Sequence, residues 1–168
     1  MDQASIETIL RQATDALGRR DASAVRALLQ PLAGPTAIPP VLFLLAQACR
    51  VDSDGEGELA AIDRLLALQP HHLGGLLMKG AALSRAGHED GAIAPYQMAL
   101  AIAEQARRSG QNLPPMLASE VNRAAQWVER HIAERAARID DALPQEGFGP
   151  GKRSEAIDEA LAVLRGDA

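Results

Sequence analysis

Two segments of the chain align with each other at an offset of 34 residues, and both carry apolar residues at helical spacing. A period of this length predicts a unit of two helices repeated along the chain, because one helix pair cannot bury its apolar face alone. The matched positions are Leu42, Leu45, Ala46, Cys49, Ile62 and Leu65, which correspond to Leu76, Lys79, Gly80, Leu83, Tyr96 and Ala99.

Composition agrees with a fold made only of helices. Apolar residues make up 47% of the chain and aromatic residues 2%, so Leu, Ala, Ile and Val must form the core, and no segment has the alternation of a strand. Helix N-caps, glycines and prolines mark the element ends, and Gly18 is expected to be a left-handed cap. The expected helices are 6–18, 21–31, 40–51, a fourth ending near 69, 73–85, 89–107, 114–143 and 154–165.

The predicted organisation is one repeat domain over residues 1–143, followed by a linker and short helix over 144–168. The long helix from 114 to 143 caps the stack, with an apolar stripe that includes Ala124, Val128 and Ile132. Pro95 falls inside an expected helix, where a proline removes an N–H bond and clashes with the preceding turn. We therefore expect a kink between Gly91 and Pro95.

Residues 73–104 resemble the tetratricopeptide consensus. Leu76 stands where that family usually has tryptophan, and the following consensus positions are occupied by Gly80, Leu83, Gly87, Ala92, Tyr96 and Ala99. The resemblance implies an all-α solenoid of antiparallel helix pairs. It also implies a concave groove that binds polypeptides, lined here by Phe43, Leu44, Gln47, Arg50, Leu77, Met78, Ala81, Ser84 and Arg85.

The expected groove combines an apolar strip with positive charge. Phe43 and Met78 would form the strip, and Arg50 and Arg85 would flank it, so a peptide with an acidic group is the expected ligand. The alternative is that the capping helix fills the groove and buries the strip.

A second resemblance covers residues 65–125. "HLGGLLMKGAALSRAGHEDGAIAPYQMAL", followed by "LPPMLASEVNRA", is similar to the N-terminal helical region of bacterial aspartyl/asparaginyl β-hydroxylase family proteins. In that family the region precedes an oxygenase domain that uses Fe(II) and 2-oxoglutarate, and these 168 residues contain no such strand-rich segment. The chain is then either a module that positions a polypeptide or such a catalytic domain, or an adaptor unrelated to hydroxylation.

Charge and cysteine content exclude several function classes. A net charge of −5 and a pI near 5.3 disfavour nucleic acid as a partner. The single cysteine, Cys49, excludes an internal disulfide and fits a reducing, cytoplasmic location. The longest apolar run, "VLFLLAQAC", is far shorter than the ~20 residues that cross a bilayer. We expect no membrane partner.

Few residues suggest chemistry, and we expect neither an active site nor a cofactor. Asp52, Asp54, Glu56 and Asp63 fit part of the twelve-residue calcium-loop pattern, but its last position normally holds glutamate. The alternative is a turn whose acidic residues favour the N-terminus of the next helix. His71, His72, His88 and His131 lack partners at metal-ligand or catalytic spacing.

Overall fold

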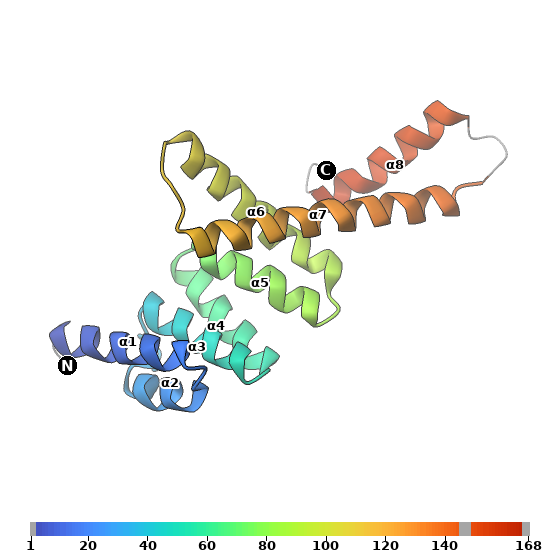
Figure 1. The fold of residues 1–168 in the computed structure, drawn as a ribbon. Helices are drawn as coiled ribbons and strands as arrows, with labels where there is room; N and C mark the ends of the chain where they lie inside the picture. The colour runs from blue at the N-terminus through green and yellow to red at the C-terminus, as the bar shows by residue number, and fades with distance from the viewer. Residues whose placement is uncertain (1–2, 145–148, 166–168) are drawn as a thin grey trace. The chain divides into compact units, whose positions relative to one another are not determined.

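The computed structural model describes the backbone of residues 3–144 and 149–165, and the side chains of all of these except residues 164 and 165. These parts of the chain contain helices and no strand, so the all-α prediction is confirmed (Figure 1). In order along the chain the elements are α1 (Gln3–Gly18), α2 (Ala22–Leu29), the 3-10 turn η1 (Gln30–Leu32), α3 (Pro39–Val51), α4 (Gly55–Leu68), α5 (Leu73–Arg85), α6 (Glu89–Arg108), α7 (Pro115–Ala142) and α8 (Pro150–Arg165).

The chain divides into two compact units, Met1–Ala82 and Leu83–Ala168, which we call the first unit and the second unit. Their boundary lies within α5. In the first unit α1, α2 and α3 share one core, to which α4 contributes Leu65. The fully buried side chains of this core include Val25, Leu29, Val41 and Leu65.

Four of the described helices end with the same turn. Arg20, Ser53, Gly87 and Gly110 follow α1, α3, α5 and α6, and all four have positive φ, of 59°, 60°, 79° and 73°. In each turn the next N–H bonds to a carbonyl five residues back, from Asp21 to Ala16, Asp54 to Cys49, His88 to Leu83 and Gln111 to Ala106. This is the Schellman closure, which satisfies the last carbonyls of a helix. The turns after α1, α3 and α5 are spaced by 33 and 34 residues, close to the 34-residue offset read from the sequence, whereas the turn after α6 follows Gly87 by 23 residues.

Two of the four turns lead directly into a side-chain cap for the next helix. Asp21 accepts from the Ala24 N–H and Asp54 from the Gly57 N–H, both at 2.9 Å. The expectation that Gly18 is the left-handed residue is wrong, because α1 ends at Gly18 and Arg20 takes that conformation. For a residue with a Cβ this conformation costs about 1–2 kcal/mol. Arginine thus stands at a position where glycine is favoured.

In the second unit, α6 and α7 pack together through small and aromatic residues. Ala92, Ala99 and Ala124 are buried, and the Tyr96 and Trp127 rings lie 5.2 Å apart. This packing agrees with the small residues that the repeat pattern requires. Helix α6 runs continuously through the buried Pro95, and the kink expected there stays a prediction.

Helix α8 folds back along α7 (Figure 1). Arg153 donates from Nε to a carboxylate oxygen of Asp140 at 2.9 Å and from Nη2 to its backbone carbonyl at 2.6 Å, and Leu161 is 3% exposed. The helix begins at Pro150, four residues before the predicted start, because a proline fits the first helical turn. The part of the predicted linker at 145–148 lies outside the described residues.

Candidate functional site

The nine predicted groove residues differ widely in exposure. Leu44, Leu77 and Met78 are buried at 8%, 5% and 5% exposure, whereas Arg50 and Arg85 are exposed. The remaining four, Phe43, Gln47, Ala81 and Ser84, are half-buried. Seven of the nine belong to the first unit, and Ser84 and Arg85 belong to the second.

The apolar strip expected to contact a peptide is packed inside the first unit. Met78 packs against Ala46 and Ile62, and the Phe43 ring lies 5.0 Å from the His72 ring. A Cβ added to Gly74 would meet Phe43 at 3.0 Å, so α5 approaches that ring closely. The strip is therefore a contact between helices of this unit, which corrects the expectation of an open apolar surface at Phe43 and Met78.

Two other predicted groove residues do line a pocket. Gln47 and Arg50 of α3 surround a volume of about 310 Å³ together with Leu17 and Arg20 from the end of α1. Val51 completes the lining. All five belong to the first unit, so the pocket lies where the first helices of two consecutive pairs meet. We call it the α1–α3 pocket.

His72 has a structural role at the start of α5. Its Nδ1 accepts a hydrogen bond from the Gly75 N–H at 2.9 Å, and this bond takes the place of a carboxylate cap. Burial lowers the pKa of the His72 ring below its ordinary value of 6.5. The neutral ring is thus the form that the fold uses, because only an unprotonated Nδ1 can accept.

This cap predicts a pH dependence. A histidine whose pKa is lower in the folded state stabilises the fold above its ordinary value of 6.5, and that contribution is lost as the pH falls through the folded value. We expect the first unit to lose stability on acidification below about 6.5, and His72→Ala to lower its free energy of unfolding by about 1 kcal/mol at pH 7.5. Urea unfolding at several pH values tests this. In His72→Asn, which retains a capping acceptor, the pH dependence should shrink while stability at pH 7.5 is kept.

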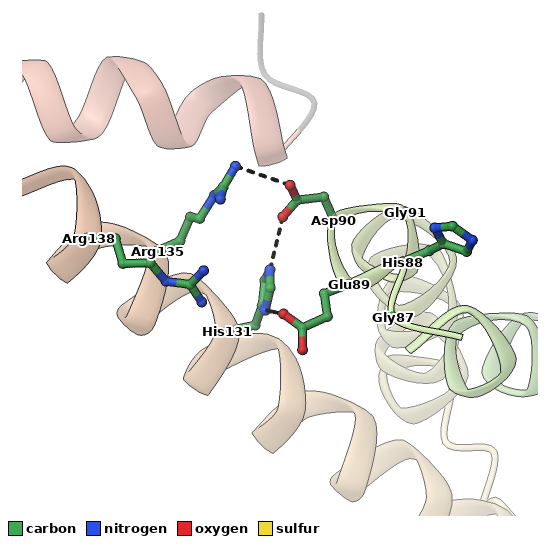
Figure 2. Close-up of a pocket in the computed structure, with 8 residues that line it drawn as sticks. All are labelled: Gly87, His88, Glu89, Asp90, Gly91, His131, Arg135 and Arg138. Atoms are coloured by element: carbon green, nitrogen blue, oxygen red, sulfur yellow. Dashed lines mark hydrogen bonds and ion pairs between the residues drawn. The ribbon is translucent and has the colours of Figure 1, made fainter. Parts of the chain in front are cut away.

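A larger, more polar pocket of about 550 Å³ lies in the second unit, beside the N-terminus of α6 and one face of α7. Figure 2 shows the His131 ring between Glu89 and Asp90, with Arg135 directed to Asp90 and His88 pointing away from His131. The His131 side chain is 6% exposed. Its Nε2 lies 3.1 Å from Asp90 Oδ1 and its Nδ1 lies 3.5 Å from Glu89 Oε2. Arg135 Nη2 donates to Asp90 Oδ2 at 3.1 Å.

These contacts hold α7 against the N-terminus of α6. The His131 ring stacks on Trp127 with centroids 4.9 Å apart and an angle of 5° between the planes. Both ring nitrogens face carboxylates, and the residues that line the pocket include no serine, threonine, cysteine or lysine nucleophile. The acidic residues also favour the N-terminus of α6 through its dipole. We call Glu89, Asp90, His131 and Arg135 the α6–α7 polar cluster.

Little in the sequence groups these four residues. His131, Arg135 and Arg138 recur at i, i+4 and i+7 and so share a face of α7, which is the one pattern that points to this side of the helix. The apolar stripe indicated Ile132, yet the buried residues of α7 are Ala124, Val128 and His131.

The carboxylates of the calcium-loop pattern have other partners. Residues 55–63, which are positions 4 to 12 of the pattern, lie in α4. Asp52 pairs with Arg26 at 2.6 Å, Asp54 caps α4 and lies 3.5 Å from the same arginine, and Asp63 pairs with Lys79 at 2.9 Å. Within residues 3–144 and 149–163, no three His, Cys, Asp or Glu side chains are placed to hold a metal ion.

Cys49 lies near the end of α3, before the turn that leads into α4, and it is buried at 9% exposure. Arg26 Nη2 donates to its sulfur at 3.6 Å. Burial raises the pKa of the Cys49 thiol, and the Arg26 guanidinium opposes that shift. A buried, protonated thiol is a poor nucleophile, so Cys49 acts here as a packing residue.

In the part of the chain with described coordinates, no helix has the length and apolar character needed to cross a bilayer. Comparison with known proteins found no match to the chain among family models, curated proteins or solved structures.

Proposed function

We propose that the chain is a non-catalytic protein-interaction module of the tetratricopeptide type, which binds a polypeptide on the face formed by the first helices of its pairs. The spacing of 33 and 34 residues between the helix-ending turns at Arg20, Ser53 and Gly87 is the observation that carries this proposal. Regular repeats of a helix pair build extended surfaces, and such surfaces are typically used to bind other proteins.

The α1–α3 pocket supports the same proposal. It lies on α1 and α3, the first members of two consecutive pairs, and it includes Gln47 and Arg50 from the groove expected by resemblance. Leu44, Leu77 and Met78 are buried, so they are not available to contact a ligand on this unit. We therefore propose recognition by polar and charged groups in place of an apolar strip.

The resemblance of residues 65–125 to the hydroxylase family's helical region favours a polypeptide partner or joined domain with that oxygenase activity. This part of the proposal rests on sequence resemblance alone. The alternative is an adaptor whose partner is unrelated to hydroxylation. The hydroxylase-related module and the adaptor would use the same binding face.

Selection of twelve-residue peptides from a display library, followed by NMR titration of the full chain, tests the proposal. We expect amide shifts concentrated in α1 and α3, with the exposed sides of α2 and α4 unchanged. Failure to select any saturable binder, or shifts confined to α2 and α4, would contradict it. Turnover of 2-oxoglutarate by the chain would contradict its non-catalytic character.

A further inference from the structure

The α1–α3 pocket carries uncompensated positive charge. Its lining contains two arginines, Arg20 and Arg50, and no acidic residue. Both arginines are exposed, and within the described residues neither side chain makes a hydrogen bond or an ion pair. Two other arginines of the same unit are engaged, since Arg26 pairs with Asp52 at 2.6 Å and Arg64 donates to the Gly34 carbonyl at 2.6 Å.

The other lining groups suit a carboxylate attached to a polypeptide. Gln47 supplies an amide that can donate a hydrogen bond, and Leu17 and Val51 are half-buried apolar residues that can contact the aliphatic part of an acidic side chain. Guanidinium groups form bidentate, charge-assisted hydrogen bonds with carboxylates. The pocket volume of about 310 Å³ is of the size that holds a small group and not a whole folded surface.

The backbone of Arg20 gives an independent reason to assign its side chain a function. Arg20 has a φ of 59°, held by the bond from its N–H to the Leu17 carbonyl at 2.8 Å and by the Asp21 to Ala16 closure. At the corresponding turns the chain has Ser53 after α3 and, after α5, Gly87, the residue that this conformation favours. Residues in such a conformation occur preferentially at ligand-binding sites.

We propose that the α1–α3 pocket binds a carboxylate of an acidic polypeptide segment, with Arg20 and Arg50 pairing with the carboxylate and Gln47 donating to it. This inference rests on the proposed function, because it names the kind of partner that the interaction module takes. The carboxylate can belong to a glutamate or aspartate side chain or to a chain terminus, and the probes below separate the two.

The probe is a fluorescein-labelled eight-residue peptide with four glutamates and a free C-terminus, and its binding to the full chain is measured by fluorescence anisotropy. A second probe has an amidated C-terminus, and a third has glutamine in place of glutamate. We expect the first probe to bind, with weaker binding at 0.5 M salt, a salt level at which charge interactions are screened beyond ~3–5 Å. Loss of binding only on amidation assigns the pocket to a chain terminus, and loss only with glutamine assigns it to acidic side chains.

Arg20→Asn and Arg50→Gln are the test variants, and each should weaken binding on the order of tenfold. Asparagine tolerates the left-handed conformation, so the melting temperature of Arg20→Asn should stay unchanged. Ser53→Asn changes the equivalent turn, and Arg19→Gln removes one positive charge from the exposed residue before Arg20. Neither control should alter binding.

Three results would overturn the inference. One is equal affinity of the Arg20→Asn and Arg50→Gln variants and the wild-type chain. Another is a loss of affinity in Arg19→Gln as large as in Arg20→Asn, which would reflect net charge alone. The third is undiminished binding of the glutamine probe with an amidated end. If display-selected peptides still shift α1 and α3 in these cases, only the carboxylate assignment fails. If no peptide binds the chain, the proposed function fails as well.

Discussion

Replacing Leu65 by alanine is expected to lower the free energy of unfolding by about 2–5 kcal/mol, the range found when a large side chain is removed from a packed core. Leu65 is fully buried and joins α4 to the core formed by α1, α2 and α3. A Cβ added to Gly75 would meet its Cδ2 at 3.0 Å, so α5 also lies against it. The loss thus combines transfer of the side chain with an unfilled cavity.

Leu68→Ala is the matched control for this prediction. It lies one turn further along α4 and is 56% exposed, so its truncation should change the free energy of unfolding by less than about 0.5 kcal/mol. Urea unfolding followed by far-ultraviolet circular dichroism measures both variants. Similar losses in the two would show that Leu65 does not join these helices as described.

Replacing His131 by alanine is expected to cost about 2–4 kcal/mol in the second unit. The substitution removes a buried ring, its stacking on Trp127, and its contacts with Glu89 and Asp90. Hydrogen exchange measured by mass spectrometry should show faster exchange in α7 around residue 131.

His88→Ala tests whether that effect is specific to the α6–α7 polar cluster. His88 lines the same pocket, but its side chain is exposed and provides no cap for α6. We expect its exchange pattern to match that of the wild-type chain. Equal effects of the two histidine substitutions, or no effect of His131→Ala, would remove the anchoring role of the cluster.

Helix positions were predictable from the sequence because proline, glycine and N-cap residues mark element ends. The predicted helix over residues 73–85 coincides with α5, between Pro70 and Gly87. The position of the left-handed residue after α1 was not predictable from glycine alone. That position depends on which backbone N–H bonds to the Ala16 carbonyl. The N–H is that of Asp21, so the left-handed residue is Arg20 and not Gly18.

The lining of the α1–α3 pocket was only partly predictable. The repeat consensus places Gln47 and Arg50 on the first helix of a pair, and both line the α1–α3 pocket. Leu17 and Arg20 come from the first helix pair, which precedes the two aligned segments, so no consensus gives a register there. Met78 was predicted on the groove face but packs against Ile62. A consensus position indicates which side of the helix a residue occupies, but it does not indicate how deeply the side chain is buried.

The α6–α7 polar cluster was beyond prediction for a different reason. Apolar periodicity identifies buried positions only where the residues are hydrophobic. His131 is polar and yet buried, so the pattern does not include it. Its partners Glu89 and Asp90 lie about 40 residues earlier in the chain, and as first-turn residues of α6 they already had a local explanation in the helix dipole.

The stacking of Trp127 on His131 has a consequence for measurement. Trp127 and Tyr96 are the chain's single tryptophan and single tyrosine, and both lie in the second unit. Intrinsic fluorescence therefore reports on Leu83–Ala168 alone, while the backbone signal comes from helices of both units. Unfolding of one sample can therefore be followed by fluorescence, which reports the second unit, and by circular dichroism, which reports both units. If the two unfolding curves coincide, the units unfold together.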